Sequence, residues 1–142
     1  MKKLVNKTLF IDTAPLIYYI EGNSNYNHQL KTLFEANEKG ELYFQTSVLT
    51  LLEVLVQPLR LRKQSLADQY EEILTTSPNL EIFDVNIEIS RKSAELRANY
   101  NIKTPDSIQI ATGIVNNANF FFTNDKGLKR LNEIEVLTLD DL

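Results

Sequence analysis

KTLFIDTAPLIYYI, from Lys7 to Ile20, places a short apolar run directly before a helical pattern. The run KTLFI has the length and the apolar side chains of a buried strand. APLIYYI follows it with Pro15 early in the first expected helical turn, where proline is well tolerated. A strand followed at once by a helix is the unit from which alternating α/β folds are built.

The same alternation continues along the chain. Further strands are predicted at ELYFQ, LEIFDV, NFFFT and EVLTL (41–45, 80–85, 119–123 and 135–139). Helices are predicted at 27–39, stopped by Gly40, at 47–57, 66–76 and 88–100, at 106–115, opened by Thr104 and Pro105, and at 126–132. Alternating strands and helices predict a three-layer α/β/α sandwich with a mainly parallel central sheet.

Composition indicates an ordinary globular chain. Its 142 residues are 43% hydrophobic and 24% charged, with no linker or repeat, so we expect a single domain over residues 1–142. Cysteine is absent, which excludes a thiolate metal site and agrees with a cytoplasmic location. Lys7 and Asp12 interrupt any signal-peptide core, and we expect no membrane insertion. A net charge of -4 restricts nucleic-acid contacts to local basic patches.

The segment SVLTLLEVLVQ, residues 47–57, holds an acid in apolar surroundings. Seven of its eleven residues are aliphatic and fall on all sides of a helix, which predicts a helix largely enclosed by other elements. Glu53 lies in its middle, and burying an ionised carboxylate costs roughly several kcal/mol unless a cation or donors replace water. Because no basic residue lies three or four positions away, we favour a functional site for Glu53 over a long-range ion pair.

Three more acids stand where strands end or helices begin. Asp12 follows TLFI, Asp106 follows Thr104 and Pro105, and Asp125 follows NFFFTN. Each taken alone is explained as a helix cap or turn residue. Strand ends converge at one edge of a parallel sheet, however, and a carboxylate cluster there would require a cation. Oxygen ligands select Mg²⁺ or Mn²⁺, which predicts metal-assisted phosphodiester hydrolysis.

Four motifs in order, LFIDTAPLIYYIEG, TSVLTLLEVLV, KTPDSIQIATGI and FFTNDKGLKRL, resemble the PIN domain over almost the whole chain, and in particular the VapC-type toxins of toxin–antitoxin pairs. The resemblance implies a Mg²⁺- or Mn²⁺-dependent endoribonuclease that acts on RNA, with Asp12, Glu53, Asp106 and Asp125 as its acidic residues. It also implies a cognate antitoxin and a homodimer. Thr123 matches the hydroxyl residue common before the last acid and is a candidate metal ligand with the four acids, although a threonine bonding the local turn explains it equally well.

One departure from the family pattern lies directly after Asp106. The family more often has small or aliphatic residues where this chain has DSIQIA. Ser107 and Gln109 therefore leave the local packing open at this point.

Other functions explain fewer of these residues. A receiver-type phosphoacceptor would use Asp84, Asp12 and Thr123 but leaves Glu53 and Asp106 unexplained. A haloacid-dehalogenase-type phosphatase would need an acid where Ala14 stands, and His28 is the only histidine. A PIN-like module that only binds RNA or partners gives no reason to gather four acids.

Basic and aromatic residues near the acids are candidates for RNA contacts. Arg60 to Lys63 follow the Glu53 helix, and Lys126, Lys129 and Arg130 follow Asp125. Each alone is explained as an ordinary surface residue. Tyr18, Tyr19 and Tyr26 are typical of core positions rather than of base-stacking platforms.

Overall fold

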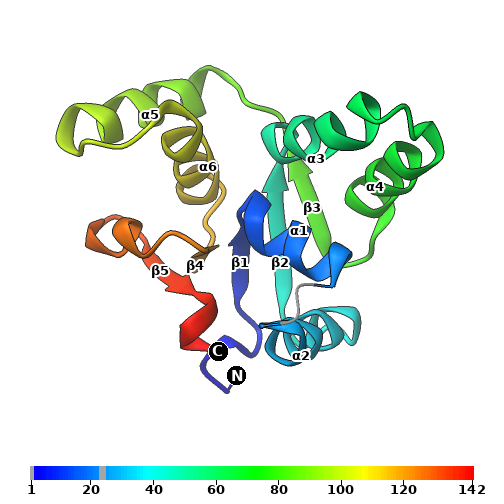
Figure 1. Cartoon of the computed structure of the whole chain (residues 1–142). Coiled ribbons are helices and arrows are strands. Elements are labelled where there is room, and N and C mark those ends of the chain that lie inside the picture. The colour runs from blue at the N-terminus through cyan, green and yellow to red at the C-terminus, as the bar shows by residue number, and fades with distance from the viewer. Residues whose placement is uncertain (1, 23–24) are drawn as a thin grey trace.

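The structure is a computed structural model that describes residues 2–22 and 25–142. Five parallel strands form one sheet in the order β3-β2-β1-β4-β5 (Figure 1). The strands are β1 (Thr8–Ile11), β2 (Tyr43–Ser47), β3 (Leu80–Phe83), β4 (Phe120–Thr123) and β5 (Glu135–Thr138). The predicted parallel sheet is confirmed.

Six α-helices lie between these strands in the described chain. They are α1 (Thr13–Glu21), α2 (Asn27–Glu38), α3 (Val48–Arg60), α4 (Gln64–Thr76), α5 (Ile87–Asn99) and α6 (Thr104–Val115). Short 3₁₀ helices occur at η1 (Lys2–Leu4), η2 (Lys126–Arg130) and η3 (Leu139–Asp141). The helix predicted over 126–132 is therefore a 3₁₀ turn, and α6 begins at Thr104 with Lys103, rather than Thr104, at its N-cap.

Period-two side chains on the central strands build the core on both faces of the sheet. Leu9 and Phe122 point to the face covered by α1 to α4, whereas Phe10 and Phe121 point to the face covered by α5 and α6. The rings of Phe10 and Phe121 stack with their centroids 5.5 Å apart. A strand buried on both faces needs a continuous apolar run, which explains FFF in β4. Figure 1 shows the two groups of helices on either side of the sheet.

Close approach of α6 to the central strand requires a glycine. A Cβ placed on Gly113 would lie 3.2 Å from the Cβ of Phe10, closer than ordinary van der Waals contact. Because Phe10 is fixed in the middle of β1, α6 would have to move away from the sheet to accept a larger residue. Gly113 thus allows α6 to pack close to β1, which fixes how near Asp106, in the first turn of α6, lies to the strand ends.

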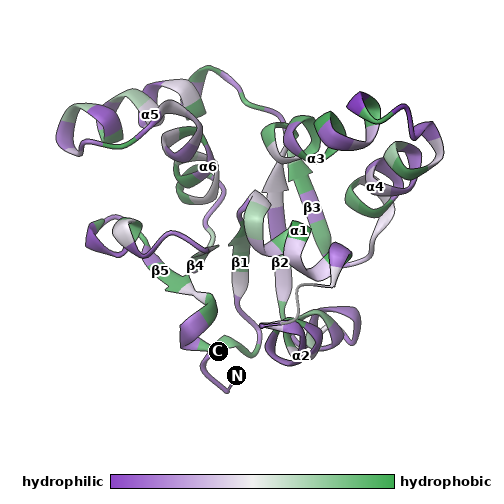
Figure 2. Ribbon diagram, in the orientation of Figure 1, coloured by the Kyte–Doolittle hydropathy of each residue, from purple (hydrophilic) through white to green (hydrophobic). Residues whose placement is uncertain are grey.

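The helix that carries Glu53 is less enclosed than the sequence suggested. Only one face of α3 is buried, through Thr50, Val54 and Pro58, while several of its aliphatic side chains are exposed. Glu53 itself is exposed. The prediction of a largely enclosed helix was wrong, because hydrophobic residues around a helix do not reveal which side faces another element. Figure 2 shows the hydrophobic character of α3.

Within residues 2–22 and 25–142, no helix is long and apolar enough to cross a membrane.

Candidate active site

Three of the four predicted acids line one cavity at the carboxyl edge of the sheet. Asp12, Glu53 and Asp106 surround a space of about 260 Å³, together with Thr13 and Gln109. Each acid comes from a different part of the fold: the end of β1, the middle of α3 and the first turn of α6. Parallel strands with helices on both faces bring such positions to one edge, as the sequence predicted.

Asp12 is the most buried of these acids and its carboxylate accepts hydrogen bonds from two neighbouring groups. Its Oδ1 accepts the backbone N–H of Thr13 at 2.8 Å, which caps α1. Its Oδ2 accepts the hydroxyl of Thr123 at 2.8 Å. The pKa of Asp12 is raised to about 6, first by burial and to a smaller degree by the charges of Asp106 and Glu53, against the lowering effect of these hydrogen bonds. Asp12 is therefore both a cap and a perturbed acid.

Asp106 lies in the first turn of α6, where some neighbouring groups raise its pKa and one lowers it. Burial raises its pKa first, and the charges of Asp125 and Glu53 add to this effect. Lys103, just before the helix, lowers the pKa in the opposite direction. The part of this rise in pKa that comes from Asp125 and Glu53 shows that carboxylates are crowded into one region.

Glu53 reaches the cavity from α3, and among the described residues Thr13 is its hydrogen-bond donor. The hydroxyl of Thr13 donates to its Oε1 at 2.8 Å. In the described part of the chain, Glu53 takes part in no ion pair. The alternative of a long-range ion pair is wrong among the described residues, because the exposed Glu53 side chain has no base within ion-pair distance.

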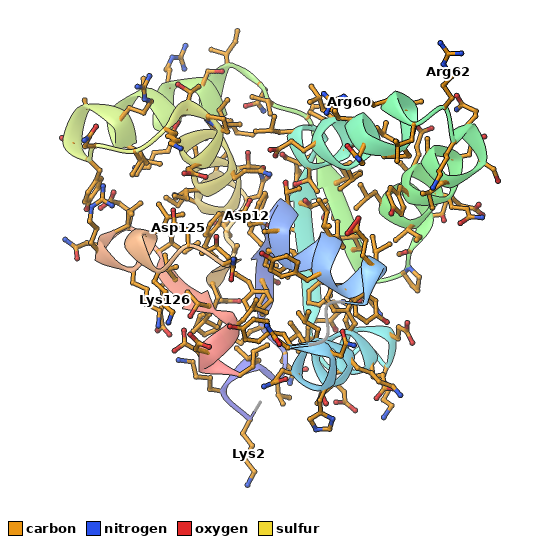
Figure 3. The ribbon with its side chains drawn as sticks, viewed as in Figure 1. Lys2, Asp12, Arg60, Arg62, Asp125 and Lys126 are labelled. Carbon is orange, nitrogen blue, oxygen red and sulfur yellow. The ribbon has the colours of Figure 1, made fainter. Side chains whose placement is uncertain are left out.

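Asp125, the fourth predicted acid, does not line the cavity but is joined to Asp12 through Thr123. The backbone N–H of Asp125 donates to the Thr123 hydroxyl at 3.2 Å, and that hydroxyl donates to Asp12. Thr123 therefore bonds both the local turn and an acid of the cavity. Asp125 also accepts the N–H of Gly127 at 2.9 Å, and a Cβ on Gly127 would crowd its Oδ1 at 3.0 Å. Figure 3 shows Asp12 and Asp125 on adjacent segments.

The chemistry of the donor set fits a hard divalent cation. Carboxylate oxygens are the ligands that Mg²⁺ and Mn²⁺ prefer, and two of these acids have raised pKa values that a cation would counteract. Over the described ranges, however, no three acidic or histidine side chains stand close enough to hold an ion as placed. The structure thus brings three acids around one cavity without closing them into a coordination shell.

Sequence comparison identifies the family of this fold. The family model of the PIN domain matches residues 9–134. The chain belongs to the PIN domain family. No curated protein is significantly similar to it in sequence.

Solved structures share the PIN fold over nearly the whole chain. VapBC2 from Rickettsia felis, solved with a DNA fragment from its promoter, is 19% identical, with a TM-score of 0.74 over 92% of this chain and 98% of that one. A toxin–antitoxin complex from Klebsiella pneumoniae is 22% identical, with a TM-score of 0.71 over 92% and 97%. Mycobacterium tuberculosis VapC20, described as a toxin that cleaves the sarcin-ricin loop, is 15% identical, with a TM-score of 0.67 over 89% and 98%.

The PIN topology separates the residues that a receiver-type site would need. Asp84 follows β3 at one edge of the sheet, whereas Asp12 follows the central strand β1. Asp84 is exposed and does not line the cavity around Asp12. The receiver-type alternative was therefore wrong.

Several polar residues of this PIN domain were not recognised as parts of the site. Thr13 bonds Glu53, and Thr50 and Gln109 continue a hydrogen-bond path behind it. Ser107 is buried and bonds Ser93 of α5 at 2.6 Å, so it serves the packing of two helices. The only available signal was the unusual pair of polar residues in DSIQIA. Lys103 was also missed, although it directly precedes Thr104.

The basic group that follows Asp125 already has partners within the PIN domain. Lys126 pairs with Asp140 at 2.6 Å, and Lys129 pairs with Asp141 at 2.7 Å. Arg130 donates to the backbone oxygens of Gly127 and Asn101. The aromatic candidates Tyr18, Tyr19 and Tyr26 are partly buried against the core, as predicted.

The raised pKa of Asp12 predicts how metal-free stability changes with pH. A folded-state pKa of about 6, above the ordinary 3.8, gives a stabilising contribution that is full below pH 3.8 and is lost as the pH rises through 6. In EDTA, the unfolding free energy of Asp12→Asn relative to that of the parent should therefore rise by on the order of 2 to 3 kcal/mol between pH 4 and pH 7. Denaturant unfolding of both proteins across this range measures the difference. A constant difference would contradict the prediction.

Proposed function

We propose that the protein is a Mg²⁺- or Mn²⁺-dependent endoribonuclease and the toxin of a toxin–antitoxin pair. The observation that carries the proposal is the cavity in which Asp12, Glu53 and Asp106 meet at the carboxyl edge of a PIN fold. The sarcin-ricin loop cleavage described for VapC20 supports RNA as the substrate. Purified protein should cleave RNA with Mg²⁺ or Mn²⁺ and should stop when EDTA is added.

In this proposal Asp12, Glu53, Asp106 and Asp125 hold the cation, and Thr123 orients Asp12. A divalent cation supplies activation of a water molecule and offsets charge on the scissile phosphate. The chain's own part is to hold the carboxylates ionised and correctly turned. Each carboxylate accepts a hydrogen bond that orients it: Asp12 from the Thr123 hydroxyl, Glu53 from the Thr13 hydroxyl, and Asp125 from the N–H of Gly127.

The antitoxin is proposed from the VapBC and toxin–antitoxin complexes that share the fold. An apolar cavity of about 370 Å³ between α1, α2 and α4 suits a hydrophobic segment of such a partner. Its walls include Leu16, Ile20, Phe34 and Ile73. Co-purification with the product of the adjacent reading frame would test this partner.

Arg60, Arg62 and Lys63 are the proposed RNA-contacting group. In the described chain none of them takes part in an ion pair, and Lys63 lines a second cavity that also contains Glu53. Figure 3 shows Arg62 projecting outward from the region of α3 and α4, at a distance from Asp12. RNA would therefore extend from the acids along α3.

Replacing these three residues by glutamine should weaken RNA binding and make it less sensitive to salt. Three lost phosphate contacts should reduce the slope of log K against log salt by about 2 for a single strand, at roughly 0.7 per contact. Filter binding of RNA to uncleaving Asp12→Asn protein at several salt concentrations gives the slope. The matched control, Lys126→Gln with Lys129→Gln, should change the slope less because both lysines are already paired. Equal slopes in the parent and the triple variant would exclude this group.

A homodimer is proposed through the exposed apolar face of α3. Leu52, Val56 and Leu59 are 59%, 41% and 48% exposed, and their spacing places them on one side of the helix. Contiguous apolar side chains on a surface mark an interaction site more often than scattered ones do.

Val56→Glu should convert the dimer to a monomer, because it places a charge at the centre of this apolar face. Light scattering after size exclusion should give twice the chain mass for the parent and one chain mass for the variant. Val5→Glu, at a residue 49% exposed and remote from α3, is the control and should stay dimeric. A dimeric Val56→Glu would place the interface elsewhere.

A further inference from the structure

A row of buried polar side chains runs through the interior of the protein and ends on Glu53. The Ser47 hydroxyl, at the end of β2, donates to Oε1 of Gln109 at 2.5 Å. The other end of that amide, Nε2, donates to the Thr50 hydroxyl at 2.7 Å. Thr50 lies 3.3 Å from the Thr13 hydroxyl, which donates to Glu53.

Counting protons gives this row one direction. A carboxylate only accepts hydrogen bonds, so the single hydroxyl proton of Thr13 is used on Glu53. The two threonine hydroxyls lie 3.3 Å apart, and with the Thr13 proton used on Glu53 only Thr50 is left to donate between them. Every link from Ser47 onward therefore donates toward the carboxylate, and links in one direction strengthen one another.

Thr13 connects two acids of the cavity at once. Its backbone N–H donates to Asp12 and its hydroxyl donates to Glu53, both at 2.8 Å. A free threonine hydroxyl could rotate to other acceptors. Thr50 is held in place by Gln109 and donates to the Thr13 oxygen. This contact limits rotation of the Thr13 hydroxyl and keeps its proton directed at Glu53.

The end point of the row distinguishes positioning from simple packing. Ser47, Thr50 and Gln109 are buried, and polar groups placed there only to join α3, α6 and β2 could bond the nearby backbone. Instead the row leaves the interior and stops at an exposed side chain with no ion pair among the described residues. Gln109 also lines the cavity itself.

We infer that Gln109 is a positioning residue that acts through Thr50 and Thr13 to fix the Glu53 carboxylate beside Asp12 and Asp106. The inference rests on the proposed function, because it assigns Glu53 to the cation. It explains why α6 carries a buried amide three residues after Asp106.

Calorimetric titration with Mn²⁺ tests the inference without depending on cleavage. Thr50→Val removes one hydroxyl with little change in shape, and Gln109→Leu removes the amide. Each should raise the Kd for Mn²⁺ by about 10-fold or more, the effect typical of groups that orient metal ligands. Thr50→Ser restores the hydroxyl and should recover most of the affinity.

Thr112→Val is the matched control. Thr112 is also buried in α6, but its hydroxyl donates to the backbone of Ile108 and not toward the cavity. This variant should keep the parent's Kd for Mn²⁺ even if its melting temperature in EDTA falls.

The outcomes separate the inference from the proposed function. A parent that binds no Mn²⁺ overturns both. A parent that binds Mn²⁺, with Thr50→Val and Gln109→Leu melting lower but binding it equally well, overturns the inference alone and makes the row structural. If Gln109→Leu does not fold, the comparison of Thr50→Val with Thr50→Ser decides.

Discussion

Asp12→Asn and Asp106→Asn should each lower the rate of RNA cleavage by at least about 100-fold in Mg²⁺ or Mn²⁺, because each removes one negative ligand from the proposed cation. Asparagine at position 12 can still accept the N–H of Thr13 and cap α1, so the fold should persist. Single-turnover cleavage of a labelled RNA, with melting curves of the same samples, measures both effects.

Asp84→Asn is the control for this loss of activity. Asp84 is exposed after the edge strand β3 and does not line the cavity, so its substitution should leave the rate unchanged. Cleavage that persists in EDTA would contradict the metal-dependent mechanism. A parent protein that binds RNA without cleaving it in Mn²⁺ would instead favour a PIN-like binding module.

The second large effect concerns stability with and without metal. In EDTA, Glu53→Gln should melt no lower than the parent, because it relieves repulsion from Asp12 and Asp106 while glutamine can still accept from Thr13. Mn²⁺ at a hundred times its Kd should stabilise the parent by about 2.7 kcal/mol. For a chain of this size this corresponds to a rise of roughly 10 °C in Tm. The variant should rise much less at the same Mn²⁺ concentration.

Glu21→Gln is the matched control for this comparison. Glu21 lines the second cavity, the one that contains Glu53 and Lys63. It does not line the cavity that Glu53 shares with Asp12 and Asp106. Its melting temperature should rise with Mn²⁺ as much as that of the parent. An equal rise for Glu53→Gln, or a marked fall of that variant in EDTA, would make Glu53 a structural residue.

Predicting the elements from local patterns succeeded because their causes are local. The apolar run before Asp12 and the run of three phenylalanines before Thr123 are strands, since strands covered on both faces favour continuous apolar runs. The same reasoning located the acids at strand ends and at the start of a helix. Errors of one to three residues arose at element ends, as at Thr104, where capping alternatives are close in energy.

Predictions that depended on neighbours from distant parts of the chain were less secure. The aliphatic residues of α3 indicated burial on every side, yet Leu52 and Val56 face outward. Lys126 and Lys129 were candidates for RNA contacts, but Asp140 and Asp141 already pair with them. Periodicity describes one element at a time and does not state which face another element covers.

The sequence by itself determined the alternating strands and helices, the parallel sheet and the position of each acid along them, because these follow from side-chain polarity and backbone preference within a few residues. Only the tertiary structure decided which side chains meet. Ser47 and Gln109 are 62 positions apart, and Thr13 and Glu53 are 40 apart. Hydrogen bonds depend on distances of about 3 Å, which only the packing of α1, α3 and α6 on the sheet sets.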